Sequence, residues 1–282
     1  MTGLIRSEIR KVFTTNLWWA LLIPVAVLSL GSGWMGTGFG SINQIEAELG
    51  RPLPLGLLTM SMSTNFSTIF AGLLGALAIA GEHRNKSITT TYLTADSRGA
   101  VLAAKLLTYT GLGLLYGVVN VAAGTIGALL GAGTNGLGEL ADWFSVGGAG
   151  LLAMVLWTLL GVGFGAVVAS PVVAVMVLLI YKFVFEFIVT SFLLTSDPSG
   201  VSAYLPGTAG SGIVGNLAVP VFVRAVSGTN EQMVPQDVFD VLHFFFGGSY
   251  GHPWWLSLLT FAGYTAVFVL AGWLVSGRRD VT

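Results

Sequence analysis

The stretch WFSVGGAGLLAMVLWTLLGVGFGAVVASPVVAVMVLLIYKFVFEFIVTSFLL, Trp143 to Leu194, contains two charged residues, Lys182 and Glu186. As one helix it would be about 78 Å long at 1.5 Å per residue. Because a bilayer has a hydrocarbon core about 30 Å thick, the stretch must turn back and cross twice. Ser170-Pro171 is the predicted corner, because proline fits the first turn of a helix and disfavours helix at the residue before it.

The rest of the chain repeats this pattern of long uncharged windows. Hydrophobic residues make up 54% of the sequence and charged residues 9%, with a mean hydropathy of +0.82. Ordinary soluble domains carry about 25% charged residues. We therefore predict an all-α polytopic membrane protein, a single transmembrane domain over residues 1–282 with six transmembrane helices. The predicted spans are 17–35, 66–80, 102–130, 146–169, 172–194 and 254–275.

The charged residues are divided unequally between the two sides that six spans define. One side carries nine cations and four acids, and the other carries two cations and eight acids. Cytoplasmic loops collect Lys and Arg, so the cation-rich side, which includes both termini, is predicted to be cytosolic. Five or seven spans would separate the Arg278-Arg279 pair from Arg6, Arg10 and Lys11, which argues against both counts.

Two segments outside the spans have informative patterns. Residues 1–16 place apolar and basic side chains on opposite sides of a helical wheel, which predicts an amphipathic helix in the inner membrane interface. Residues 195–253 form a large external loop between spans five and six. Its apolar part, Ile213 to Val223, is interrupted by Pro220 and too short to cross. We expect an external cap there, or a re-entrant pair of half-helices covered by protein.

Glycines spaced four apart occur inside the predicted spans. Small faces of this kind let two helices approach closely in lipid. Such faces either pack spans within one chain or join two chains, and the spacing alone allows both. The pairs are Gly113/Gly117, Gly127/Gly131 and Gly161/Gly165.

The sequence lacks the motifs of several enzyme classes. No G-x-x-x-x-G-K-[ST], H-E-x-x-H or G-x-S-x-G pattern occurs, so we expect no enzymatic activity, and any ATP must be handled by another chain. Cysteine is absent, and His83, His243 and His252 are too scattered for a metal site. Basic arms are missing too, which makes nucleic acid an unexpected partner.

The most polar cytosolic stretch is the loop 81–101. Glu82 and Arg84 could form an ion pair near the end of the second span, where reduced solvation strengthens such a pair. Asn85 to Leu93 could form a short helix along the membrane surface. A solvated loop that only obeys the charge rule is the alternative.

Lys182 and Glu186 are four residues apart in the fifth span and therefore share one helical face. Ionisable groups at membrane depth are costly and usually point inward, to a partner or to water. These two residues either contact a polar substrate or gate a pathway, or they neutralise each other or brace another span.

Four blocks of sequence resemble the permease subunits of type-2 ATP-binding-cassette exporters, in particular a bacterial group. They are LIRSEIRKVFTTNLWW (4–19), GEHRNKSITTTYLTADSRGAVLAAKL (81–106), AYLPGTAG (203–210) and GYTAVFVLAGWLVSGRRDVT (263–282). The resemblance implies a half-transporter in the bacterial cytoplasmic membrane, with membrane lipid around it. A second permease copy, identical or different, would pair with it. Two separate ATPase subunits would bind ATP and Mg.

By the same resemblance, segment 1–16 is an interfacial connecting helix, loop 81–101 is a coupling loop and loop 195–253 is an external gate. The residues expected to couple to the ATPase are Glu82, Arg84, Ser87, Ile88, Thr89, Thr90, Thr91, Tyr92 and Leu93.

The second and fifth spans are our candidates for lining a translocation cavity that suits an amphipathic or hydrophobic cargo. The candidate lining residues are Phe66, Ile69, Phe70, Leu73, Phe183 and Phe187, for which ordinary packing is the alternative. An ion-gradient-driven carrier or channel is a second hypothesis for the whole chain. A lipid-modifying membrane enzyme that uses His243 and His252 is a third.

Overall fold

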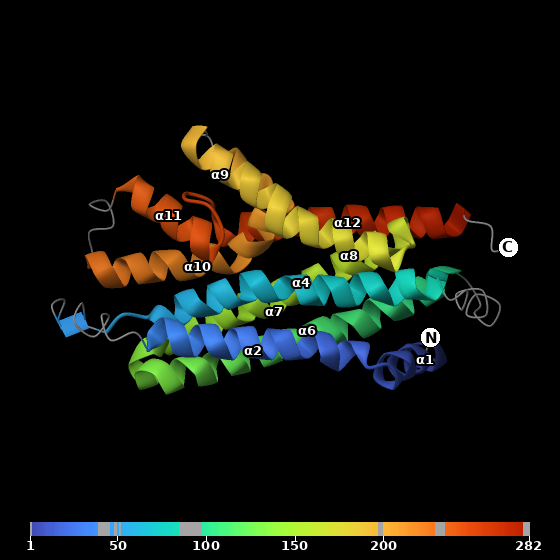
Figure 1. Ribbon diagram of the computed structural model, residues 1–282, viewed down its shortest axis with the longest axis horizontal. Helices are drawn as coiled ribbons and strands as arrows, with labels where there is room; N and C mark the ends of the chain where they lie inside the picture. The colour runs from blue at the N-terminus through green and yellow to red at the C-terminus, as the bar shows by residue number, and fades with distance from the viewer. Residues whose placement is uncertain are drawn as a thin grey trace.

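The computed structural model describes residues 2–38, 46–47, 50, 52–84, 98–196, 200–228 and 235–278, and these residues form helices and turns with no strand. Figure 1 shows the long helices running side by side along one axis. In chain order the main helices are α1 (Thr2–Thr14), α2 (Leu17–Thr37), α4 (Leu55–Arg84), α6 (Arg98–Ala132), α7 (Leu140–Val168), α8 (Pro171–Ile180), the π-helix η2 (Tyr181–Phe185), α9 (Glu186–Ser196), α10 (Pro206–Ser227), α11 (Gln236–Phe246) and α12 (Trp254–Arg278). Short 3₁₀ turns lie at η1 (Gly133–Leu137) and η3 (Val201–Tyr204).

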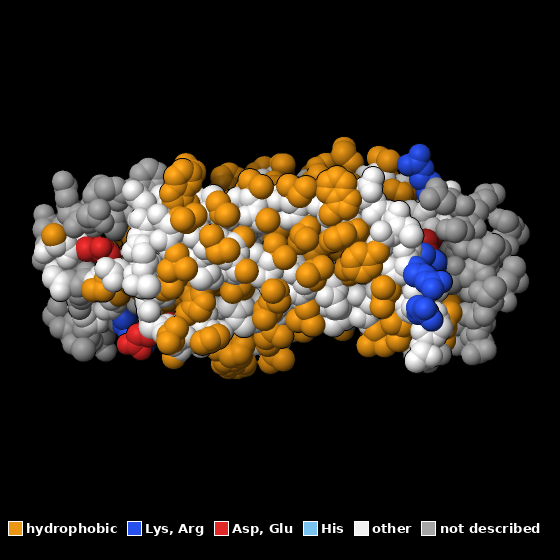
Figure 2. Space-filling model, turned by 90° about the horizontal axis from the view of Figure 1, so that it is seen from below, with side chains coloured by type: hydrophobic (Ala, Val, Ile, Leu, Met, Phe, Trp, Pro, Cys, Tyr) orange, Lys and Arg blue, Asp and Glu red, His pale blue; other side chains and the backbone are white. Residues whose placement is uncertain are grey.

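Seven helical segments of the described chain are long and apolar enough to cross a membrane, one more than the six predicted. The additional segment is α10, and the fifth predicted span is the continuous run of α8, η2 and α9. A band of hydrophobic side chains covers the middle of the face shown in Figure 2, between two polar ends.

The two ends of the molecule differ in charge. Both termini lie at the same end of the long axis (Figure 1), which also carries α1 and the last turn of α4. Lys and Arg side chains gather at this end in Figure 2, and we call it the basic end. The opposite end holds the start of α7, with Glu139 and Asp142, and we call it the acidic end. α10 and α11 lie in the half of the molecule nearest the acidic end.

The core of the bundle is built around α4 and α7, which pack against each other and both contact α6 and α10. Ile69 of α4, Trp157 of α7 and Ile213 of α10 are almost fully buried there. α2, the α8–α9 run and α12 lie outside this core and expose many large apolar side chains. This exposure is expected of helices that face lipid or another chain.

The glycine pairs pack spans within this chain, which settles the alternative that the spacing left open. Backbone of the neighbouring helix lies against one side of each pair. Gly113/Gly117 of α6 face α7, Gly127/Gly131 of α6 face α2, and Gly161/Gly165 of α7 face α4.

The predicted corner between the fourth and fifth spans is confirmed. α7 ends at Val168, and Ala169 adopts a left-handed conformation with φ 55° while its N–H donates to the Gly165 carbonyl at 2.8 Å. Pro171 then occupies the first turn of α8. Proline suits that position because its missing N–H has no helical acceptor there.

The second span begins earlier than predicted. The second span was predicted over 66–80, but α4 begins at Leu55, because hydroxyl groups in its early turns bond to their own backbone. Thr64 Oγ1, for example, donates to the Met60 carbonyl at 2.7 Å, which lets a polar residue lie buried in a membrane helix.

The prediction that Pro220 breaks the external apolar stretch is wrong, because α10 runs through it for 22 residues. Small residues before Ile213, including Gly210 and Ser211, extend the helix while they lie buried. Their low hydropathy had hidden this extension, since a hydropathy window scores composition and not the packing that small side chains allow.

Candidate functional site

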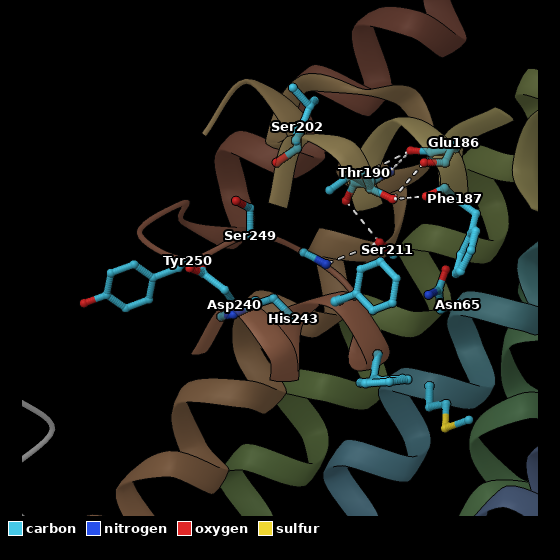
Figure 3. Close-up of a pocket in the computed structure, with 18 of the residues that line it drawn as sticks. Asn65, Glu186, Phe187, Thr190, Ser202, Ser211, Asp240, His243, Ser249 and Tyr250 are labelled. Carbon is cyan, nitrogen blue, oxygen red and sulfur yellow. Dashed lines mark hydrogen bonds between the residues drawn. The ribbon is translucent and has the colours of Figure 1, made fainter. Parts of the chain in front are cut away.

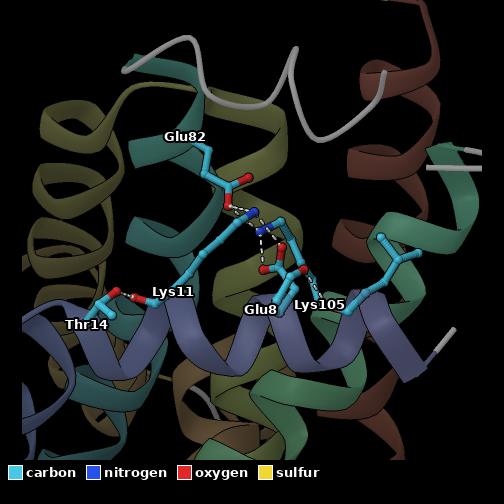
Figure 4. Close-up of polar contacts among 7 residues, drawn as sticks. Glu8, Lys11, Thr14, Glu82 and Lys105 are labelled. Carbon is cyan, nitrogen blue, oxygen red and sulfur yellow. Dashed lines mark hydrogen bonds and ion pairs between the residues drawn. The ribbon is translucent and has the colours of Figure 1, made fainter. Parts of the chain in front are cut away.

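Four charged side chains from three helices meet at the basic end (Figure 4). Lys105 Nζ of α6 lies 2.6 Å from Glu8 Oε2 of α1 and 2.8 Å from Glu82 Oε1 of α4. Lys11 Nζ of α1 lies 2.7 Å from Glu8 Oε1 and 3.0 Å from Glu82 Oε1. We call these four residues the charged quartet; its two positive and two negative charges balance.

The quartet is buried unevenly. The side chains of Glu8 and Lys105 are 3% exposed, that of Glu82 is 12% exposed and that of Lys11 is 40% exposed. Burial lowers the pKa of Lys11, but hydrogen bonds and charge attraction from Glu8 and Glu82 outweigh it, so this pKa lies above its ordinary value. Lys11 therefore stays charged, and the quartet ties α1 to the last turn of α4 and the start of α6.

A cavity of about 490 Å³ opens between α4, η2, α9, α10 and α11 (Figure 3). It lies in the half of the molecule nearest the acidic end. Its walls combine aromatic and polar side chains. The aromatic residues are Phe66, Phe183, Phe187, Phe244, Phe245 and Tyr250, and the ionisable ones are Lys182, Glu186, Asp240, His243 and Tyr250.

Lys182 and Glu186 each bind a different neighbouring helix. Lys182 Nζ donates to Asn65 Oδ1 of α4 at 2.7 Å and lies 5.1 Å from the centre of the Trp157 ring. Glu186 Oε1 accepts hydrogen bonds from the backbone N–H and the hydroxyl of Thr208, in the first turn of α10. A carboxylate is favourable there, because a helix N-terminus carries unpaired N–H groups and partial positive charge.

A sequence model of the family described as ABC-2 family transporter protein matches residues 4–197, from α1 to the end of α9. The chain belongs to this family. It is therefore a multi-pass membrane permease of an ABC transporter, and the family implies partnership with an ATP-binding subunit. No curated protein matches the chain in sequence.

Only some of the predicted coupling residues of this ABC-2 permease lie in the described part of the structure. Glu82 does not pair with Arg84, as the sequence had suggested, because Lys11 and Lys105 lie closer to its carboxylate. Arg84 is exposed and forms no ion pair within the described part of the chain. The remaining predicted coupling residues, Ser87 to Leu93, lie outside the described residues.

The predicted cavity residues separate into two groups. Phe66, Phe183 and Phe187 line the cavity, and the rings of Phe66 and Phe183 stack with centres 6.2 Å apart. Ile69 and Leu73 instead face the buried core, and Phe70 packs against it. Lys182 and Glu186 form no ion pair with each other among the described residues, although their charges attract, and each braces another helix.

His243 and His252 make separate contacts in the permease. The His243 ring is 5% exposed, and its Nδ1–H donates to the Phe239 carbonyl at 2.8 Å. His252 instead packs edge-on against Tyr204, with ring centres 5.0 Å apart. No group of three or more possible metal ligands occurs among the described side chains.

The burial of His243 is expected to make the stability of the permease depend on pH. Burial lowers its pKa to about 4, from 6.5 for an unburied histidine. Between these two values the unfolded chain binds a proton that the folded chain does not, so stability falls as the pH falls, by up to about 3 kcal/mol. The melting temperature of the detergent-purified permease should therefore drop between pH 7 and pH 4.5.

The variant His243→Asn supplies the control for this prediction, because asparagine can also donate to the Phe239 carbonyl but does not titrate. Its melting temperature should drop less than that of the wild type over the same interval. Equal drops in the two proteins would show that other groups cause the pH dependence.

Proposed function

We propose that the chain is the permease subunit of an ATP-driven exporter in the bacterial cytoplasmic membrane, with its basic end and both termini in the cytosol. Two ATPase subunits bind at that end, and a second permease completes the pathway. The chain itself hydrolyses nothing. The family match over residues 4–197 carries the proposal, supported by a sequence without a phosphate-binding loop.

The proposed topology has six crossings and one hairpin. α2, α4, α6, α7, the α8–α9 run and α12 cross the membrane, whereas α10 and α11 enter from outside and return. Two features of the fold support this: the termini lie at the same end, and α10 and α11 lie together in the half near the acidic end (Figure 1). The helix N-terminus at Pro206 then lies at membrane depth, where protein covers it and Glu186 accepts a hydrogen bond from the N–H of Thr208.

The charged quartet gives this permease a rigid connection between its cytosolic elements. It joins α1 to the two helices, α4 and α6, that flank residues 85–97. A displacement of that segment by an ATPase would therefore move α4, α6 and α1 together. The cavity lies further along α4 and next to α9, so movement of α4 would change its shape. Its aromatic walls suit an amphipathic or hydrophobic cargo.

Charge reversal of Arg84 tests both the coupling and the orientation. Arg84 is exposed, lies at the last residue of α4 and makes no ion pair among the described residues, so Arg84→Glu should leave the fold intact. With the cognate ATPase co-expressed, we expect this variant to lose about tenfold in ATPase binding and to transport less per ATP hydrolysed. Pull-down and transport in proteoliposomes measure the two effects.

Arg10→Glu is the matched control, because Arg10 is also exposed at the basic end but lies on α1. It makes the same change in surface charge and should bind the ATPase nearly as the wild type does. Equal losses in both variants would indicate a general charge effect and not a contact at the end of α4. Transport that continues without the ATPase but stops when an uncoupler collapses the ion gradient would contradict the exporter assignment. It would favour an ion-gradient-driven carrier.

A further inference from the structure

We propose that the cavity between α4, α9, α10 and α11 binds organic cations that have an apolar body, such as hydrophobic amines. The inference rests on the proposed function, since it names the class of cargo that the exporter takes. Glu186 is the residue that would hold the positive charge, and the phenylalanines would hold the apolar part.

The two carboxylate oxygens of Glu186 differ in their contacts. Oε1 accepts the hydrogen bonds from Thr208. Oε2 makes no hydrogen bond of normal geometry and lies against the backbone of Gly207, whose N–H also attracts the carboxylate. The residue is 5% exposed and lines the cavity. A buried carboxylate whose second oxygen lacks a well-aligned donor is costly to keep charged, and a bound cation would lower that cost.

Neighbouring charges favour a cation over an anion. Lys182 is directed to Asn65 and the Trp157 ring and forms no ion pair with Glu186 in the described structure. Asp240 adds a second carboxylate to the cavity wall from α11. His243 contributes no positive charge near neutral pH, because burial lowers its pKa to about 4. With Lys182, Glu186 and Asp240 in their ionised forms, the wall carries a net charge of −1.

Aromatic rings complete the site. Phe187 and Phe244 have ring centres 5.6 Å apart, and Phe244 and Phe245 have centres 5.4 Å apart. Faces of aromatic rings attract cations and also cover apolar surface. Phe183 is 41% exposed and Phe187 is 57% exposed, so the rings of the fifth span that line the cavity also reach the molecular surface. An amphipathic cation dissolved in the bilayer could therefore reach the cavity from the side.

A pair of probes with opposite charge tests this inference. Tetraphenylphosphonium and tetraphenylborate have nearly the same size and shape, so a difference in their binding reports the charge preference of the site. Binding is measured by equilibrium dialysis on the purified full-length permease in neutral detergent, with protein-free micelles as background. We expect the cation to bind at least tenfold more tightly than the anion.

Glu186→Gln keeps an acceptor for Thr208 and removes the charge, so it should fold and lose about tenfold in cation affinity. Asp240→Asn is a second variant that leaves the α10 contact untouched, and it should lose about threefold. Asp237→Asn is the matched control, because Asp237 is an exposed acid on the same helix that does not line the cavity. It should bind the cation at least as tightly as the wild type does, because the change also removes the repulsion between Asp237 and Asp240.

Equal or tighter binding of tetraphenylborate would overturn the inference, as would unchanged cation binding in Glu186→Gln and Asp240→Asn. Neither ATPase nor nucleotide is present in this measurement. Its failure would therefore reject the cation class and leave the exporter assignment, which the Arg84 variant tests separately.

Discussion

Lys105→Met is expected to destabilise the permease more than any other single change to a charged residue at its basic end. The substitution leaves Glu8 and Glu82 buried opposite a single cation, Lys11, which is itself 40% exposed. Removing one partner from a buried ion pair typically costs about 3 to 5 kcal/mol, because the remaining charge has lost both its partner and its water. Thermal melting of detergent-purified protein should show this loss.

Two further variants separate charge balance from the loss of a side chain. Glu82→Gln combined with Lys105→Met leaves one acid and one base, Glu8 and Lys11, so the double variant should recover part of the lost stability. Arg10→Met removes an exposed cation from α1 and should leave the melting temperature nearly unchanged. If Lys105→Met melts like the wild type, the quartet does not hold α1 in place.

The quartet shows where reasoning from sequence stopped. The charge rule separated the cationic and anionic sides, and it grouped Glu8, Glu82, Lys11 and Lys105 on one side without pairing them. Lys105 and Glu8 are 97 residues apart in sequence, so no local pattern joins them. Glu82 was paired with its neighbour Arg84 because only neighbours are visible in a sequence. One available signal was Lys105 itself, a lone cation near the start of an apolar span.

The regular elements were predictable because they depend on local composition. Bilayer thickness fixed the length of a span, and the rule for proline placed the corner at Ser170-Pro171, which the structure confirms. α10 was missed because its length depends on small residues that only buried packing explains. The partner of Lys182 was missed for the same reason as the quartet, since Asn65 is 117 residues away.

Part of the cavity wall could be predicted from the sequence. Phe66, Phe183 and Phe187 were expected on its wall because they lie in the second and fifth spans, and they line it. The contributions from α10 and α11 could not be foreseen, since the fold of segment 195–253 was open. The π-helix η2, which carries Lys182 in the fifth span, has no sequence signature either. π-Helical turns often mark functional sites.

Gly161→Ala is expected to disrupt the contact between α4 and α7 at the centre of the bundle. A Cβ at Gly161 would overlap the carbonyl oxygen of Gly72 and lie 3.1 Å from the backbone nitrogen of Ala76. These are backbone atoms, so the helices must separate and lose the close contact on which membrane helix packing depends. Overpacking a core typically costs about 1 to 3 kcal/mol. We expect the free energy of unfolding to fall by an amount at the upper end of this range or above it, because many contacts open together.

Gly148→Ala supplies the control on the same helix, since a Cβ there meets no atom within 4 Å. Alanine favours helix over glycine by up to about 1 kcal/mol in soluble hosts, so this variant should melt at or slightly above the wild-type temperature. The two variants add the same methyl group to α7, and only its surroundings differ. A large drop for Gly161→Ala with none for Gly148→Ala would assign the effect to the α4–α7 contact. Equal melting temperatures would mean that α4 and α7 do not approach as closely as this structure has them.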